Sequence, residues 1–196
     1  MGTALGFAVV LLRRGGNRLV EVVVNAFEGL MSRLPIVVVL MVFYYVIFGS
    51  VDIPGAAVAV CVFTLSFGAT AGSVMWNAVK AVDAGQTEAS LALGFTDSQT
   101  FFDVVLPQAA HQFLPLLSGQ LVSMAKQTSV VGYIAVMDLT RAGDVIRGLT
   151  MEAFFPLFCV AAIYFALCCL LATGMGAIIR KLDFERKPRT VKGVKL

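Results

Sequence analysis

One polar stretch, residues 88–107, lies between long apolar runs and holds the residues with the clearest chemistry. Glu88, Asp97 and Asp103 are its carboxylates, and it contains no lysine or arginine. Helices that lie on a bilayer surface usually carry lysine and arginine on their polar face. An acidic stretch with apolar residues therefore favours charge-assisted docking to a basic protein partner, with a passive surface linker as the alternative.

Local signals in this stretch predict two short helices joined by a bend. Good helix formers fill residues 84–93, and Gly94 is the natural stop because glycine adopts a positive φ without steric cost. Thr96 and Gln99 have the spacing of a capping box, which predicts the start of the second helix. Pro107 is expected to end that helix and redirect the chain.

A second polar group, Lys126, Gln127, Thr128 and Ser129, interrupts an otherwise apolar run. Lys126 lies ~20 Å along a helix from Phe113, which is too far for its ammonium group to reach the inner headgroups easily. An ionisable residue at membrane depth marks a functional site by default. The equally weighted alternative is a lysine that snorkels or pairs inside the helix bundle.

Small and hydroxylic residues form a third group, within the apolar segment 53–79. Small residues allow membrane helices to approach closely, and hydroxyl groups bond across helices. The band therefore predicts either helix packing or one wall of a polar path for a solute. Its members are Thr64, Ser66, Gly68, Thr70, Gly72 and Ser73.

The composition is that of a membrane protein: 59% of the 196 residues are hydrophobic and 14% are charged, whereas soluble domains carry about 25% charged residues. A spanning helix needs ~20 mostly apolar residues. Four full spans are predicted, at residues 34–51, 53–79, 112–137 and 153–179. Residues 1–12 are apolar but make only about half a span.

The distribution of charge predicts the orientation of these spans. Arginines gather in residues 13–33, where an amphipathic helix is expected over residues 19–30, and basic residues gather again in 181–196. Short loops rich in lysine and arginine stay in the cytoplasm. The acidic stretch 88–107 then also faces the cytoplasm, and the short turn 49–55 and the loop 138–152 face outward.

Several site classes are not predicted for this chain. His111 is its single histidine, and its four cysteines (Cys61, Cys159, Cys168 and Cys169) lie in apolar runs without metal-ligand spacing. The nucleotide-binding pattern G-x-x-x-x-G-K-[ST] does not occur. We therefore expect no metal site, no cofactor and no ATP hydrolysis on this chain.

The polar stretch resembles the EAA loop of ABC transporter permeases, whose pattern is E-A-A, three residues, G, nine residues and I-x-L-P. Here Glu88, Ala89 and Ser90 are followed by Gly94 and then by residues 104–107, V-V-L-P. Two further segments are similar to the polar amino acid branch of that family. Residues 68–76 resemble G-A-Y-x-A-E-I-x-R, with Ser73 at the glutamate and Trp76 near the arginine, and residues 126–129 resemble K-D-T-S, with Gln127 at the aspartate.

The resemblance implies an all-α polytopic membrane protein with the type I ABC importer permease fold, having about five transmembrane helices, the first one incomplete. It implies a transmembrane domain at residues 1–180, with the coupling loop at 84–107, and a basic cytoplasmic tail at 181–196. The expected ATPase-coupling residues are Glu88, Ala89, Leu91, Gly94, Phe95, Leu106 and Pro107. The expected solute-path residues are Ser66, Ser73, Trp76, Lys126, Gln127, Thr128 and Ser129.

The implied protein sits in the bacterial inner membrane and passes a polar amino acid that a solute-binding protein delivers. Its implied partners are a second permease subunit, identical or different, and two ATPase subunits that carry ATP and Mg²⁺. Two alternatives remain at this point: an ion-coupled carrier or channel subunit, which needs ionisable residues at the midplane, and a membrane scaffold without transport. Co-purification with an ATPase separates the first interpretation from both.

Overall fold

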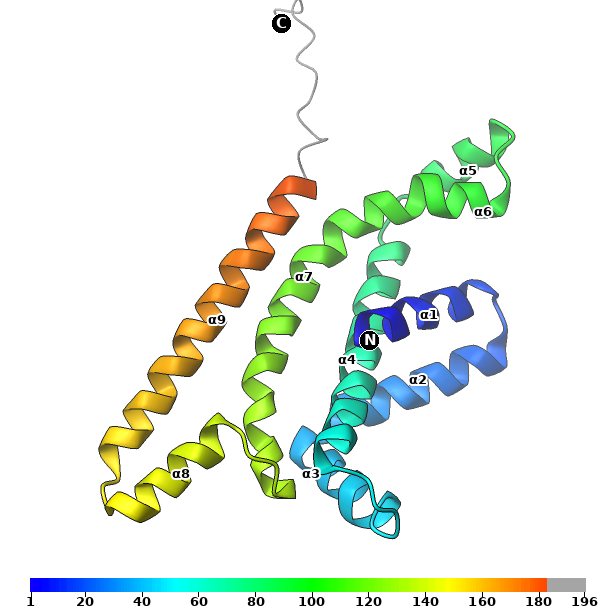
Figure 1. The fold of residues 1–196 in the computed structure, drawn as a ribbon. Coiled ribbons are helices and arrows are strands. Elements are labelled where there is room, and N and C mark those ends of the chain that lie inside the picture. Colours follow the sequence, from blue (N-terminus) through cyan, green and yellow to red (C-terminus); the bar gives the residue numbers. More distant parts are fainter. Residues whose placement is uncertain (183–196) are drawn as a thin grey trace, which may run out of the picture.

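The computed structural model describes residues 1–182, which form a set of long helices with shorter helices at both ends (Figure 1). Residues 183–196, most of the predicted basic tail, lie outside the described residues. The elements are α1 (Gly2–Arg14), α2 (Arg18–Arg33), α3 (Ile36–Met41), the π-helical turn η1 (Val42–Ile47), α4 (Gly55–Lys80), α5 (Ala84–Ala92), α6 (Asp97–Gln99), the π-helical turn η2 (Thr100–Val105), α7 (Leu106–Gln127), the 3₁₀ segment η3 (Thr128–Ile134), α8 (Leu139–Thr150) and α9 (Phe154–Leu182).

Helix α4 is the centre of the fold. It packs against α1 and α2 on one side and α7 on the other, and α9 lies beyond α7 (Figure 1). In the most apolar part of α4, 56% of the residues are buried inside the protein, compared with 6% for α9. The two hydrophobic cores therefore both include α4, one with α1, η2 and α7, and the other with α3 and η3.

Close packing of α1 on α4 depends on small residues. A Cβ atom added to Gly68 would lie 2.5 Å from Leu5 Cδ2, and one added to Gly6 would lie 2.7 Å from Ala71 Cβ. Gly72 makes the next contact, because its added Cβ would lie 3.0 Å from Val9 Cγ1. The glycines of the predicted small-residue band thus serve helix packing, one of the two expected roles.

The apolar run 34–51 does not form one straight span. Leu34 has an extended backbone (φ −91°, ψ 135°), and Pro35 precedes the first turn of α3. A residue before proline disfavours the helical conformation and proline lacks an N–H, so α2 ends here. The segments α2 and α3–η1 meet at 107° and together have the length and apolarity of one broken span. The amphipathic helix expected at residues 19–30 is α2, capped by the Asn17 side chain.

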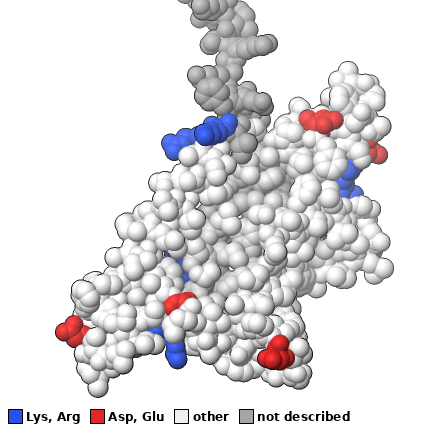
Figure 2. Space-filling view, viewed as in Figure 1, with Lys and Arg blue, Asp and Glu red and all other residues white. Residues whose placement is uncertain are grey.

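By length and composition, two described helices, α4 and α9, could each cross a membrane, and the bent pair would be a third. Helix α7 has 22 residues, but several glutamines make it less apolar than these two. In Figure 2, the charged side chains lie mainly toward the two ends of the molecule, and the surface between them is mostly uncharged. This arrangement agrees with the predicted polytopic chain.

The segment 138–152, expected to be an outer loop, contains the helix α8. The Asp138 side chain accepts hydrogen bonds from the backbone N–H groups of Thr140 and Arg141, which explains where the helix begins. Arg147 and Asp144 form an exposed ion pair at 3.1 Å on the same helix. Sequence reasoning missed α8 because its balanced charges and its glycines resemble loop composition.

Candidate functional site

The first candidate site is the hook, which we define as residues 84–107. Its first arm is α5, and Gly94 has a φ of +88°, a region that favours glycine. The Thr96 backbone N–H donates to Gln99 Oε1 at 2.9 Å, and the Gln99 N–H donates to Thr96 Oγ1 at 3.3 Å. The predicted bend at Gly94 and the predicted capping box are both confirmed.

A buried contact ties the two arms of the hook together. The hydroxyl oxygens of Ser90 on α5 and Thr100 on η2 are hydrogen bonded at 3.0 Å, and Ser90 Oγ also donates to the Thr87 carbonyl at 2.9 Å. Ser90 and Thr100 are only 5% and 3% exposed. Ser90 occupies the place of the third residue of E-A-A, and here its hydroxyl links the two arms.

Pro107 does not end the second helix, contrary to the prediction. The second arm is continuous with α7 through the π-helical turn η2, and this helical segment changes direction between α6 and the lower part of α7 (Figure 1). Pro107 lies in the first turn of α7, where a proline is tolerated, directly after η2. The second arm of the hook therefore belongs to the same continuous helical segment as α7, which lines the middle of the protein.

The outer face of the hook is exposed. Leu91 and Phe95 are 43% and 39% exposed, and Glu88 and Ala89 beside them are exposed as well. Leu106 instead packs against the core that joins α1, α4 and α7. The seven predicted coupling residues thus divide into an outer group that a partner could contact and the pair Leu106–Pro107, which connects the hook to α7.

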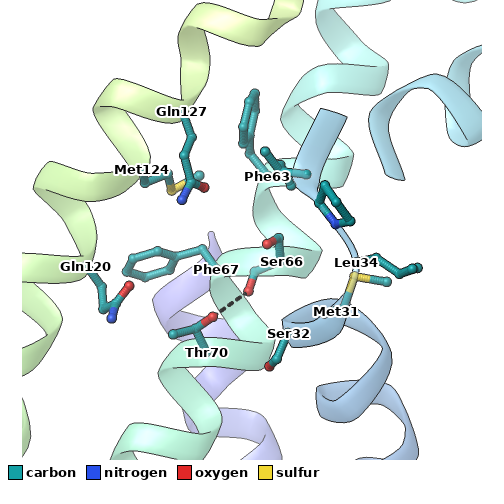
Figure 3. A pocket seen from close by; sticks show the side chains of 12 residues that line it. Met31, Ser32, Leu34, Phe63, Ser66, Phe67, Thr70, Gln120, Met124 and Gln127 are labelled. Carbon is teal, nitrogen blue, oxygen red and sulfur yellow. Dashed lines mark hydrogen bonds between the residues drawn. The ribbon is translucent and has the colours of Figure 1, made fainter. Parts of the chain in front are cut away.

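The second candidate site is a partly open cavity of about 420 Å³ lined by residues of three parts of the chain (Figure 3). Helix α4 contributes Phe63, Ser66, Phe67 and Thr70, and α7 contributes Gln120, Met124 and Gln127. The end of α2 and the bend to α3 contribute Met31, Ser32, Leu34, Pro35 and Ile36. Every polar side chain in this lining is neutral, so the cavity offers hydroxyl and amide groups but no formal charge.

The cavity unites two of the predicted solute-path residues, Ser66 and Gln127. Lys126 and Thr128 are exposed and do not line it, and Thr128 Oγ1 donates to the Ala125 carbonyl at 2.8 Å. Ser129 lines a separate space of about 220 Å³ between η3 and α8, next to Asp138, Arg141 and Asp144. The cluster 126–129 is therefore divided between two places.

The remaining predicted residues, Ser73 and Trp76, lie outside the cavity lining. The Trp76 ring is between two cations: Arg13 Cζ is 5.9 Å and Lys80 Nζ is 5.4 Å from its centroid. Arg13 in turn donates from Nη2 to Glu28 Oε2 at 3.0 Å. Trp76 is thus half-buried beside the buried Arg13–Glu28 pair that joins α1 and α2, rather than in the cavity.

Among the lining residues that sequence reasoning missed are Gln120 and Met124 on α7 and Ser32 on α2. A signal for Gln120 was available, because Gln120 and Gln127 are seven residues apart and so lie on one face of a helix. Ser32 has no such signal, since only the 107° bend brings the end of α2 beside α4 and α7. Among residues 1–182, no group of three metal-ligating side chains comes together.

Comparison with known proteins identifies a matching family model and several relatives of similar length. A family model described as "Binding-protein-dependent transport system inner membrane component" matches residues 2–182. A putative glutamine transport system permease protein GlnP of Rickettsia felis is 28% identical over 186 residues, covering 92% of this chain and 84% of that protein. The arginine ABC transporter permease protein ArtQ of Haemophilus influenzae is 33% identical over 190 residues, with coverages of 91% and 82%.

A solved structure has a fold similar to that of this chain. The fold is similar to a chain of a crystal structure described as an amino acid ABC transporter with histidines, with a TM-score of 0.83 and 26% identity. The similarity covers 92% of this chain and 85% of the other. Both the hook and the three elements around the cavity lie within the residues that the family model matches.

Proposed function

The chain belongs to the family of binding-protein-dependent transport system inner membrane components, and from this premise we propose that it is the membrane-spanning subunit of an ATP-driven amino acid importer. The observation that carries the proposal is the hook, a rigid exposed element joined without a break to a helix that lines the cavity. A lever of this kind can convert movement of a partner into movement of a cavity wall.

The hook is the surface that we assign to an ATPase partner. Leu91 at the end of α5 and Phe95 beyond the bend are both exposed and supply apolar contacts, and Glu88 supplies an anion for a basic residue of the partner. Ala89 is exposed beside Glu88, and its small side chain permits close approach. ATP and Mg²⁺ would then be bound by that partner, and this chain would not hydrolyse ATP.

The cavity is the solute path that we propose within this chain. Ser32, Ser66, Thr70, Gln120 and Gln127 offer donors and acceptors that suit polar groups of a small solute. The relatives include one named for glutamine and one named for arginine. Because the lining carries no formal charge, it favours an amino acid whose side chain is polar but uncharged over a cationic one.

The complete importer needs further subunits. We propose a second permease subunit of the same family, two ATPase subunits at the hooks and a solute-binding protein on the opposite side, all at the bacterial inner membrane. Helix α8, the second space beside Ser129 and the turn between η1 and α4 lie at the end away from the hook (Figure 1). That end is the one available to the solute-binding protein.

The test is isolation of this chain with its partners from the native membrane. An affinity tag on the chain should retain an ATPase subunit in detergent, and the complex in liposomes should take up a polar, uncharged amino acid when ATP is on the hook side. Uptake that proceeds without any ATPase and depends on an ion gradient would contradict the proposal and favour the ion-coupled carrier.

A further inference from the structure

We propose that Arg14 is a positioning residue that fastens the hook to α1, connecting the hook to the α2 wall of the cavity in addition to its chain connections to α4 and α7. This inference rests on the proposed function, because it concerns how the hook acts once an ATPase moves it. Arg14 was expected only to mark the cytoplasmic side of the chain, and its contacts with the hook come from the fold.

Arg14 contacts three residues that lie 84 or more positions away from it in the sequence. Its Nη2 donates to Ser98 Oγ at 3.2 Å, and its Cζ lies 4.8 Å from the Phe101 ring centroid and 5.8 Å from that of Phe102. The two rings meet edge to face at 5.1 Å, so they form a corner that receives the planar guanidinium. A groove of about 650 Å³, lined in part by Arg14, Asp97 and Thr100, lies beside this contact.

The contact is anchored firmly on both sides. On the hook, Phe101 is 7% exposed and belongs to the main hydrophobic core, and Thr100 before it is bonded to Ser90. On the other side, Arg14 is the last residue of α1, which packs on α4 through Gly6, Gly68 and Gly72. The Arg14 side chain thus bridges two elements that are each held in place.

The neighbouring residue, Arg13, extends the connection to α2. Arg13 Nη2 donates to Glu28 Oε2 at 3.0 Å and to Asn25 Oδ1 at 2.6 Å. Beyond Glu28, the last turn of α2 contributes Met31 and Ser32 to the cavity wall, and the bend into α3 contributes the residues that follow. Two adjacent arginines therefore point to different partners, Arg14 to the hook and Arg13 to the helix that carries this wall.

The hook is consequently connected to all three walls of the cavity. The chain itself connects it to α4 through residues 81–83 and to α7 through η2, and both helices line the cavity. A further route, through side chains, runs from Arg14 along α1 and α2 to Met31 and Ser32 (Figure 3). With Arg14 in place, a tilt of the hook acts on the α2 wall as well. Without it, the tilt acts on the α4 and α7 walls alone, and ATP hydrolysis moves less solute.

The experiment measures solute transported per ATP hydrolysed by the complete complex in liposomes. Arg14→Gln should lower this ratio about two- to fivefold, the range expected for loss of a cation–π contact at an accessible site. Arg14→Lys keeps the cation and should recover part of the ratio, although it cannot reproduce the planar fork. Arg18→Gln is the matched control, since it removes an exposed arginine near the same turn and should leave the ratio unchanged.

A double variant identifies the contact itself. Ser98→Ala, on an exposed residue, should lower the ratio less than Arg14→Gln, and adding it to Arg14→Gln should cause no further loss. The inference is overturned if Arg14→Gln transports as much solute per ATP as the unmodified chain, or if the two losses multiply. If the unmodified chain retains no ATPase at all, the proposed function itself fails, which is a distinguishable result.

Discussion

Ser90 Oγ and Thr100 Oγ1 lie 3.0 Å apart across the bend at Gly94, so the arms of the hook are joined by a buried hydrogen bond as well as by the chain. Ser90→Ala removes one partner and leaves the Thr100 hydroxyl buried, at a cost of about 1–3 kcal/mol. We expect amide hydrogen exchange in α5 to accelerate about fivefold or more, because a 1.4 kcal/mol loss changes an equilibrium about tenfold.

Matched variants distinguish the effect of the hydrogen bond on exchange from the effect of side-chain packing. Thr100→Ser keeps the hydroxyl and should exchange almost as slowly as the unmodified chain. The double variant Ser90→Ala with Thr100→Val removes both polar groups and should accelerate exchange less than Ser90→Ala alone. Equal exchange rates in Ser90→Ala and the unmodified chain would show that this bond does not hold the hook.

Gly94→Val should be the most damaging single change in the hook. The φ of Gly94 is +88°, and a β-branched residue strongly disfavours positive φ, so the bend would open or unfold. We expect solute-stimulated ATPase activity of the complex to fall to the unstimulated level. Gly94→Asn is the control, because asparagine tolerates positive φ better than other residues, and it should retain most of the stimulation. Stimulation that survives Gly94→Val would reduce the hook to a passive linker.

The sequence predicted the local features of the hook more completely than the tertiary ones. The bend at Gly94 and the Thr96 cap depend on residues close in the chain, and the structure confirms both. The prediction that Pro107 ends the second helix was wrong, because Pro107 lies in the first turn of α7, directly after the π-helical turn η2. The pair Arg13–Glu28 and the placement of Ser32 depend on how α1, α2 and α4 pack, which periodicity alone does not encode.

Cysteine labelling tests the orientation. A cysteine at Gly85, exposed in the hook, should react with an impermeant reagent only from the cytoplasmic side. Gly148 on α8 is the suitable outer position, since nothing lies within 4 Å of an added Cβ, whereas Gly143 is buried against Val160. The background needs serine at the four native cysteines, because Cys159 and Cys169 are exposed. Labelling of both positions from one side would contradict the predicted topology.

The cavity predicts a rank order among polar residues of the solute path. Gln127→Leu removes an amide from the lining and should reduce uptake about tenfold, corresponding to one hydrogen bond of ~1.4 kcal/mol. Lys126→Met changes an exposed neighbour outside the lining and should have the smaller effect. Assembly with the ATPase is the control for both variants. Greater loss from Lys126→Met would restore the original expectation that Lys126 faces the path.

The ion pair Arg13–Glu28 should matter for stability because both side chains are nearly inaccessible, at 6% and 11% exposure. Glu28→Gln leaves the Arg13 cation without its anion, and breaking a buried pair costs about 3–5 kcal/mol. The pair is imperfect, since Arg13 Nε and Glu28 Oε1 have no hydrogen-bond partner among the described residues. An apolar double replacement, Arg13→Met with Glu28→Leu, should therefore recover most of the thermal stability that Glu28→Gln loses.

The exposed pair Arg147–Asp144 provides the comparison on the same chain. Its side chains are 55% and 50% exposed, and an exposed pair contributes less than about 1 kcal/mol. Arg147→Met should therefore barely change the unfolding temperature in detergent, while Glu28→Gln lowers it clearly. If the two single variants shift that temperature equally, burial does not determine how much each ion pair contributes to stability. The connection of α1 to α2 would then depend on apolar packing, and the route from Arg14 to the cavity wall would lose its middle step.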